Sequence, residues 1–101
     1  MPKEIGKVGV VGLGTMGAGI AQISVQSGFE TVGREVSSEL AERGRDTITR
    51  YLTRGVEKRR LSQHELDSAL ARLSLTTELA DLADCDLVIE AIVEEDRKSV
   101  V

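Results

Sequence analysis

The chain has 101 residues, of which 41% are hydrophobic and 30% charged, with a net charge of -4. This is the composition of one small globular domain, and an acidic balance argues against nucleic acid as a partner. No apolar run approaches the length of about 20 residues that a membrane helix needs, so we expect no membrane partner. One cysteine and a short, polar start without a signal peptide indicate a cytoplasmic protein.

Residues 8–35 predict a strand, a tight glycine turn, a helix and a second strand. Residues 8–11 are mostly β-branched and run into Gly12, which is typical of a buried parallel strand. Residues 15–27 have a helical pattern, with Gly28 placed where a glycine ends a helix, and residues 29–35 form the second strand. The expected apolar face of this helix comprises Met16, Ile20 and Ile23, with Ala18 and Ala21 beside them.

A helical hairpin is predicted between the second and third strands. Ser37 suits the cap of a helix that runs to about Lys58. Ser62 and Glu65 form the S-x-x-E pattern of a capping box, which opens a second helix through Arg72. This connection is much longer than the usual crossover.

The remaining residues predict two more strands. Residues 73–76 form a third, and Thr77 caps a brief helical turn at residues 79–82. Residues 87–93 are apolar almost throughout, so we expect this fourth strand to be central, although no fifth strand follows to cover its far edge. The fold class is therefore α/β: an incomplete Rossmann-type parallel sheet of order 3-2-1-4, with helices on both faces and a helical hairpin insertion after the second strand.

The first strand leads into a G-x-G-x-x-G motif, formed by Gly12, Leu13, Gly14, Thr15, Met16 and Gly17. Because it follows a strand and opens a helix, the motif predicts a dinucleotide site. The first glycine permits the turn, the second lets a pyrophosphate approach the backbone, and the third lets the helix pack on the strand. The helix N-terminus supplies N–H groups to the phosphates.

Glu35 completes the motif at the end of the second strand, 18 residues after Gly17. A carboxylate there accepts hydrogen bonds from the adenine ribose, which favours NAD over NADP. The adjacent Arg34 leaves two interpretations open: contact with a 2′-phosphate, or a solvated charge at a strand end, which we prefer. His64 is expected to face solvent and Cys85 to be a small packing residue, and no metal-ligand cluster is apparent.

Three separated blocks resemble the 3-hydroxyacyl-CoA dehydrogenase family, especially its bacterial 3-hydroxybutyryl-CoA type. They are KVGVVGLGTMGAGIAQISVQS at residues 7–27, RRLSQHELDSALARL at 59–73 and TTELADLADCDLVIEAIVE at 76–94. The resemblance implies an NAD-dependent oxidoreductase of fatty acid metabolism that interconverts L-3-hydroxyacyl-CoA and 3-ketoacyl-CoA. It also implies cofactor contacts at the glycine motif, Glu35, Ala91 and Glu94, and a coenzyme A contact at Lys58. A neighbouring serine of the family is Tyr51 here.

Several parts of the family are missing from this chain. The catalytic histidine with its glutamate, the catalytic serine and asparagine, and the helical dimerisation domain have no counterpart, so no catalytic residue is named. We expect the full-length protein to be a homodimer and the fragment alone to be inactive. Two other interpretations remain: a stand-alone NAD-binding regulatory module without catalysis, or a 3-hydroxyisobutyrate-type dehydrogenase.

The last six residues depart from the family pattern. We divide the chain into residues 1–95, a partial NAD-binding domain, and residues 96–101, a tail of sequence DRKSVV. A family lysine is expected at position 99, where Ser99 stands, and Lys98 is out of register. DRKSVV is also what a common sequencing adapter encodes in one reading frame, which suggests an assembly artefact; the alternative is a short natural tail.

Overall fold

The computed structural model describes residues 5–92, which form four strands, three α-helices and one 3₁₀ turn. In chain order the elements are β1 (Lys7–Val11), α1 (Thr15–Gln26), β2 (Glu30–Arg34), α2 (Ser38–Glu57), α3 (Gln63–Ala71), β3 (Leu73–Thr76), η1 (Leu79–Leu82) and β4 (Leu87–Glu90). The predicted tail lies outside the described residues.

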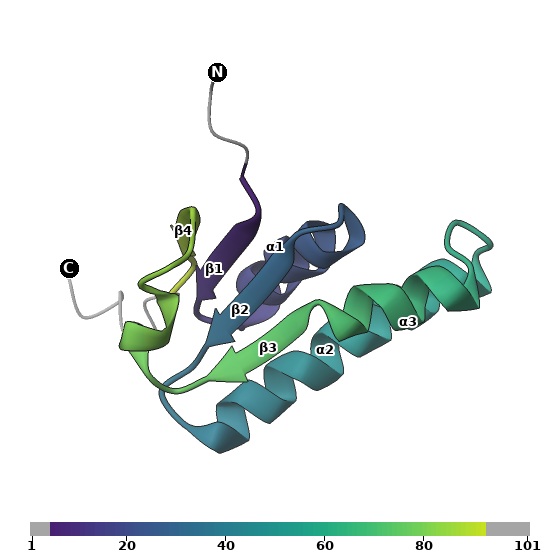
Figure 1. Cartoon of the computed structure of the whole chain (residues 1–101). Coiled ribbons are helices and arrows are strands. Elements are labelled where there is room, and N and C mark those ends of the chain that lie inside the picture. The colour runs from purple at the N-terminus through teal and green to yellow at the C-terminus, as the bar shows by residue number, and fades with distance from the viewer. Residues whose placement is uncertain (1–4, 93–101) are drawn as a thin grey trace, which may run out of the picture.

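The strands form one parallel sheet of order β3-β2-β1-β4, which confirms the predicted topology (Figure 1). Val10 of β1 lies between Gly33 of β2 and Ile89 of β4. The carboxyl ends of β1, β2 and β4 therefore meet at one edge of the sheet, where ligands bind in open α/β folds.

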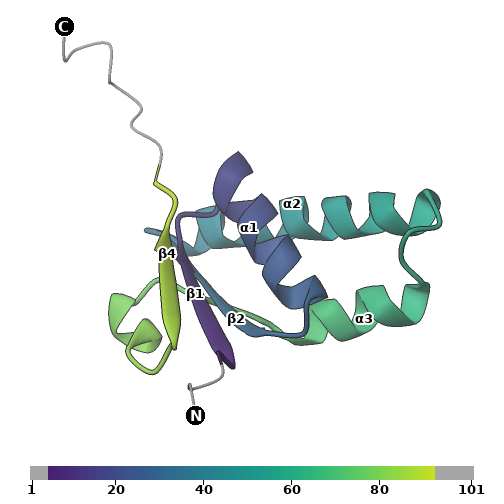
Figure 2. The ribbon, with the colours of Figure 1, turned by 90° about the horizontal axis from the view of Figure 1, so that it is seen from above.

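The helices of residues 5–92 gather on one face of the sheet. Two successive crossovers, through α1 and through the hairpin of α2 and α3, move in the same direction, and right-handed crossovers then place their helices on the same face. The connection from β3 to β4 runs back across the sheet and lies on the opposite face (Figure 2). Within residues 5–92 that face carries η1, the brief helical turn predicted at residues 79–82, and no α-helix, so helices on both faces are not found in this part of the chain.

The larger core lies between the sheet and the helices. It includes Val10, Val25 and Ile48, all fully buried. The predicted apolar face of α1 is wrong for Met16 and Ile23, which are 54% and 63% exposed. Ile20 packs against the core, and α1 turns its small residues to the sheet. The residues that it buries are Gly17, Ala18, Ala21, Ser24 and Val25. Close helix–strand packing leaves no room for longer side chains, so size decided the orientation rather than hydrophobicity.

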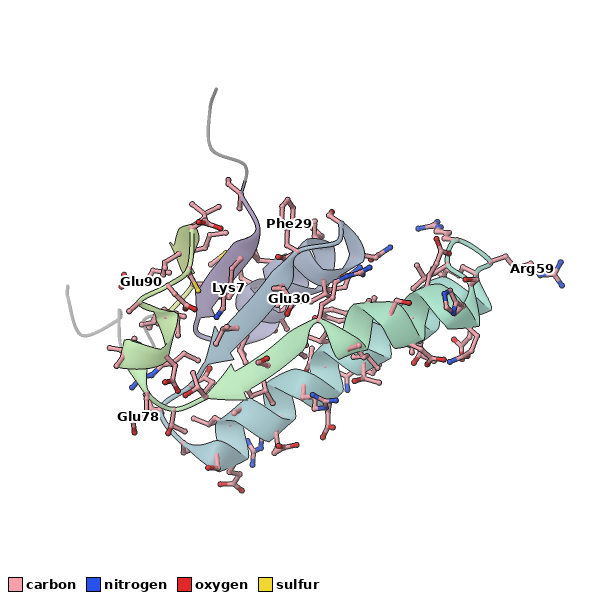
Figure 3. All side chains as sticks on the ribbon, viewed as in Figure 1. Lys7, Phe29, Glu30, Arg59, Glu78 and Glu90 are labelled. Carbon is pink, nitrogen blue, oxygen red and sulfur yellow. The ribbon has the colours of Figure 1, made fainter. Side chains whose placement is uncertain are left out.

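The helical hairpin follows its predicted caps. The Ser37 side chain accepts a hydrogen bond from the backbone N–H of Leu40, and the Ser62–Glu65 capping box is complete. The turn between the two helices holds Arg59 at a positive φ of 59°, and its side chain points away from the body (Figure 3). The hairpin thus presents a basic tip at its far end.

Two expectations near the C-terminal end of the described chain are wrong. Thr77 does not cap η1, because the N-cap of η1 is Glu78. The backbone N–H of Glu78 donates to the hydroxyl of Thr76 at 3.0 Å, so Thr76 rather than Thr77 forms the local side-chain contact at this turn. The fourth strand is not central within residues 5–92, where β4 is an edge strand, with Leu87 42% and Val88 49% exposed. Of the apolar residues of β4, Ile89 packs against the larger core, whereas Leu87 and Val88 are exposed.

Candidate functional site

The candidate site is built around the glycine loop between β1 and α1. Gly12 has a φ of 96°, a backbone conformation that favours glycine. Its N–H donates to the carbonyl oxygen of Arg34 at 2.9 Å, and a Cβ on it would lie 2.9 Å from the carbonyl oxygen of Ala91. Gly12 is therefore the point at which the ends of β2 and β4 close on β1.

The other two glycines of the motif have opposite surroundings. A Cβ at Gly17 would lie 1.7 Å from the Gly12 carbonyl oxygen, so only glycine lets α1 start so close to β1. A Cβ at Gly14 would meet no atom within 4 Å, because Gly14 faces open space. Gly14 is also the N-cap of α1 and supplies no side-chain acceptor to the first turn of the helix. The helix N-terminus is thus open to an anion.

Glu35 lies directly over this loop. Its Oε2 accepts a hydrogen bond from the backbone N–H of Leu13 at 2.6 Å, and Oε1 accepts from Val36 at 3.2 Å. The 22-residue separation between Glu35 and Leu13 is bridged by the pairing of β1 with β2. Glu35, which the sequence assigned to the cofactor ribose, therefore contacts the glycine loop directly.

Leu13 contributes its backbone to the site and its side chain to the core. Only 4% of Leu13 is exposed, and its side chain fills the space left by Gly33 of β2 and Gly44 of α2. A Cβ at either glycine would lie within 3 Å of Leu13 atoms. Glycine inside a strand signals such a close approach of another element, as Gly33 does here.

A cleft of about 300 Å³ lies at the carboxyl edge of the sheet between the ends of β2 and β4. Its lining includes four predicted residues, Gly12, Gly14, Glu35 and Ala91. Prediction missed Val11, Val36, Leu40 and Ile92, and it had left Arg34 open between a 2′-phosphate contact and a solvated charge. Most of these residues stand at or just after a strand end. A smaller pocket beside it, about 260 Å³, is lined by Thr15, Arg43 and Arg50 among others. We name the first space the cofactor cleft.

The remaining predicted residues lie elsewhere or cannot be placed. Met16 is exposed on the first turn of α1, and Glu94 lies outside the described residues. Lys58 is at the C-terminal end of α2 and lines a different pocket, about 220 Å³, with Tyr51, Arg54 and Arg60. The structure therefore separates the expected coenzyme A contact from the cofactor cleft.

The two candidate nucleophiles or bases outside the cleft behave as packing or surface residues. Burial raises the pKa of the Cys85 thiol, which packs against Val11, Val32 and Leu82. A protonated, half-buried thiol is a poor nucleophile. His64 is exposed on α3, as expected. Within residues 5–92 no cluster of three or more metal-ligating side chains occurs, and no helix there is long and apolar enough to cross a membrane.

A parallel sheet with a glycine loop, an open helix N-terminus and a carboxylate at the end of the second strand defines a dinucleotide-binding Rossmann domain. The profile of the "3-hydroxyacyl-CoA dehydrogenase, NAD binding domain" family matches residues 7–99. The chain belongs to the 3-hydroxyacyl-CoA dehydrogenase family, as its NAD-binding domain, and its cofactor is NAD.

Individual relatives agree with this assignment. The chain is 45% identical over 91 residues to a probable 3-hydroxybutyryl-CoA dehydrogenase of Deinococcus radiodurans, covering 90% of this chain and 32% of that protein. The crystal structure of FadB2 of Mycobacterium tuberculosis has a TM-score of 0.89 at 43% identity, covering 95% of this chain and 34% of that one. The crystal structure of (S)-3-hydroxybutyryl-CoA dehydrogenase PaaH1 from Ralstonia eutropha has a TM-score of 0.86 at 40% sequence identity, covering 94% of this chain and 34% of that one. The chain spans about a third of the length of these relatives.

Proposed function

We propose that this chain is the cofactor-binding part of an enzyme that oxidises L-3-hydroxyacyl-CoA, with 3-hydroxybutyryl-CoA the favoured substrate, to 3-ketoacyl-CoA, or catalyses the reverse reduction. The observation that carries the proposal is the cofactor cleft. There, Gly14 faces open space and Glu35 is fixed over the loop, so the cleft fits a pyrophosphate and a ribose side by side. The relatives named for 3-hydroxybutyryl-CoA supply the substrate class.

The residues of the loop hold the phosphates of NAD in this proposal. The first-turn N–H groups of α1, from Thr15 to Gly17, point from the helix N-terminus, where the helix dipole favours negative charge. Gly14 lets the pyrophosphate approach the backbone, since it places no side chain in the open space. Met16, exposed on the first turn of α1, is assigned to this group by its place in the motif.

Glu35 selects the form of the cofactor. Its carboxylate accepts the ribose hydroxyls while one oxygen stays on the Leu13 N–H. A 2′-phosphate would lie against this negative charge, so NAD is favoured over NADP. Ala91, buried at the end of β4, forms the opposite wall, and Glu94 is assigned to the cofactor by the family resemblance alone.

Bound NAD supplies the acceptor for the substrate hydride, and this chain positions that cofactor. Lys58 is proposed to contact the phosphates of coenzyme A. The cationic side chains of Arg54 and Arg60 line the same pocket and support this assignment. The homodimer of the full-length protein, its cytoplasmic location, and the absence of membrane and nucleic-acid partners are part of the same proposal.

Calorimetric titration of the chain with NADH tests the cofactor site. Gly14→Val fills the open space beside the loop, and we expect it to abolish saturable binding at concentrations that saturate the unmodified chain. Gly19→Val is the matched control, since Gly19 lies on the same helix, outside the cleft, and its Cβ also meets no atom within 4 Å. Equal binding by all three proteins, or none by the unmodified chain, would contradict the proposed site.

A further inference from the structure

Arg34 is held at two points and is not the solvated charge that the sequence suggested. Its carbonyl oxygen accepts the Gly12 N–H at 2.9 Å, and its Nε donates to the carbonyl oxygen of Thr77 at 3.1 Å. The residue is half-buried and lines the cofactor cleft. Because Thr77 lies in the connection from β3 to η1, the guanidinium is positioned by two different strand ends.

The face of the sheet on which Arg34 lies follows from strand alternation. Gly33 faces Leu13 and the helices, so Val32 and Arg34 face the opposite side, where Val32 packs with Leu82. The guanidinium therefore lies beside the carboxyl end of β2. Arg34 lines the cleft together with exposed apolar residues, Val36, Leu40 and Ile92.

We infer that Arg34 is a positioning residue for the adenine ring of the cofactor, with its guanidinium plane as one wall and the apolar residues of the cleft, Ile92 foremost, as the other. This inference rests on the proposed NAD site. A flat, delocalised cation stacks well on an aromatic face. The exposed apolar side chains beside it gain by covering a flat, weakly polar ring and would gain nothing from a phosphate.

The other interpretation of Arg34, as a ligand of a 2′-phosphate, fits these contacts less well. The next residue is Glu35, whose carboxylate is fixed over the loop by Leu13 and Val36. A phosphate close enough to meet Arg34 would also meet that negative charge. The Thr77 tether in addition uses one edge of the guanidinium, which lowers its capacity to grip an anion by a bidentate contact.

The test compares the unmodified chain with Arg34→Ala and Arg34→Lys by titration with three ligands. These are NADH, NADPH and reduced nicotinamide mononucleotide, which lacks the adenosine half. We expect NADH affinity to fall about fivefold in Arg34→Ala. Arg34→Lys should not restore it, because an ammonium keeps the charge without the plane. Affinity for the mononucleotide should stay unchanged in both variants.

The outcomes distinguish the alternatives. A loss selective for NADPH, removed at high salt, would overturn the inference in favour of a phosphate contact. Equal losses for NADH and the mononucleotide would reduce Arg34 to a structural role, and unchanged NADH binding would overturn the inference alone. If the unmodified chain binds none of the three ligands, the proposed function fails together with the inference, and that result is distinct from the others.

Discussion

The two faces of the sheet are packed very differently. On the helical side, α1 and α2 bury Ala18, Ala21, Val25 and Ile48 completely. On the opposite side the buried apolar cluster consists of Val11, Val32 and Leu82, with Cys85 half-buried against it. The two walls of the cofactor cleft are therefore held in place in different ways. Side-chain packing holds the wall formed by the glycine loop, whereas the wall formed by β4 is held mainly by backbone hydrogen bonds between β4 and β1.

Polar contacts strengthen β4 at its start. Asp86 Oδ2 accepts the backbone N–H groups of Gly6 and Lys7, at 2.8 and 3.0 Å. Lys7 also pairs with Asp84, whose Oδ2 lies 2.9 Å from its Nζ. These contacts fix the register of β4 at the end remote from the cleft, so the cleft end of β4 depends on the close approach of Ala91 to Gly12 and Gly17.

The largest expected effect comes from disturbing the packing of α1 on the glycine loop. Gly17→Ala places a Cβ 1.7 Å from the Gly12 carbonyl oxygen, and backbone must move to admit it. We expect a loss of more than about 3 kcal/mol of unfolding free energy, together with loss of NADH binding. Urea unfolding followed by circular dichroism measures the first quantity.

Gly19→Ala is the matched control for that change. It lies two residues further along α1 with open space around its Cβ, so alanine should stabilise the helix by about 0.5–1 kcal/mol. Equal stabilities for the two variants would mean that the contact of Gly17 with the Gly12 carbonyl does not limit the packing of α1.

A comparison of one leucine from the helical side of the sheet with one from β4 should give an effect of intermediate size. Leu52 of α2 is 1% exposed in the main core, and Leu52→Ala should cost about 3 kcal/mol through lost burial and the cavity left behind. Leu87 of β4 is 42% exposed, and Leu87→Ala should cost less than about 1 kcal/mol. Similar losses in urea unfolding would show that the β4 side is as tightly packed as the helical side.

The features that the sequence predicted correctly are those determined by short, local sequence patterns. The glycine motif, the caps at Ser37 and Ser62 and the order of the strands depend on short patterns with one structural solution, and the structure confirms them. Glu35 could be assigned to the loop because strand length and motif spacing fix where the second strand ends. The same local patterns predicted Gly12, Gly14 and Glu35, which line the glycine-loop side of the cofactor cleft.

The features that were missed depend on partners distant in the sequence. The orientation of α1 is decided by the space above the sheet, which hydrophobicity along the helix does not reveal. Gly33 and Gly44 accommodate Leu13 from two other elements, and Arg34 is tethered to Thr77, 43 residues away. None of these contacts leaves a periodic trace in the sequence, because each requires the sheet and helices to be assembled first.

The smallest expected effect concerns the ion pair beside β4. The hydrogen bond from Lys7 is the main cause that lowers the pKa of Asp84, and the same bond raises the pKa of Lys7. A lowered carboxyl pKa stabilises the fold above the pKa of the unfolded chain, about 3.8. That contribution disappears as the pH falls through the lower pKa of the folded state. Asp84 is exposed and Lys7 only half-buried, so solvent screens the pair and its contribution is small.

Asp84→Asn should therefore lower the melting temperature slightly at neutral pH and not at all once the pH is low enough to protonate Asp84 in both states. Thermal melts across the acid range measure this, with Asp46→Asn as the control that removes the same charge from an exposed position on α2. A difference between Asp84→Asn and the unmodified chain that persists at the lowest pH would assign the effect of Asp84 to packing or to the backbone. In that case the stability of β4 would depend less on this charge pair than on the backbone hydrogen bonds between β1 and β4 and on the contacts of Asp86.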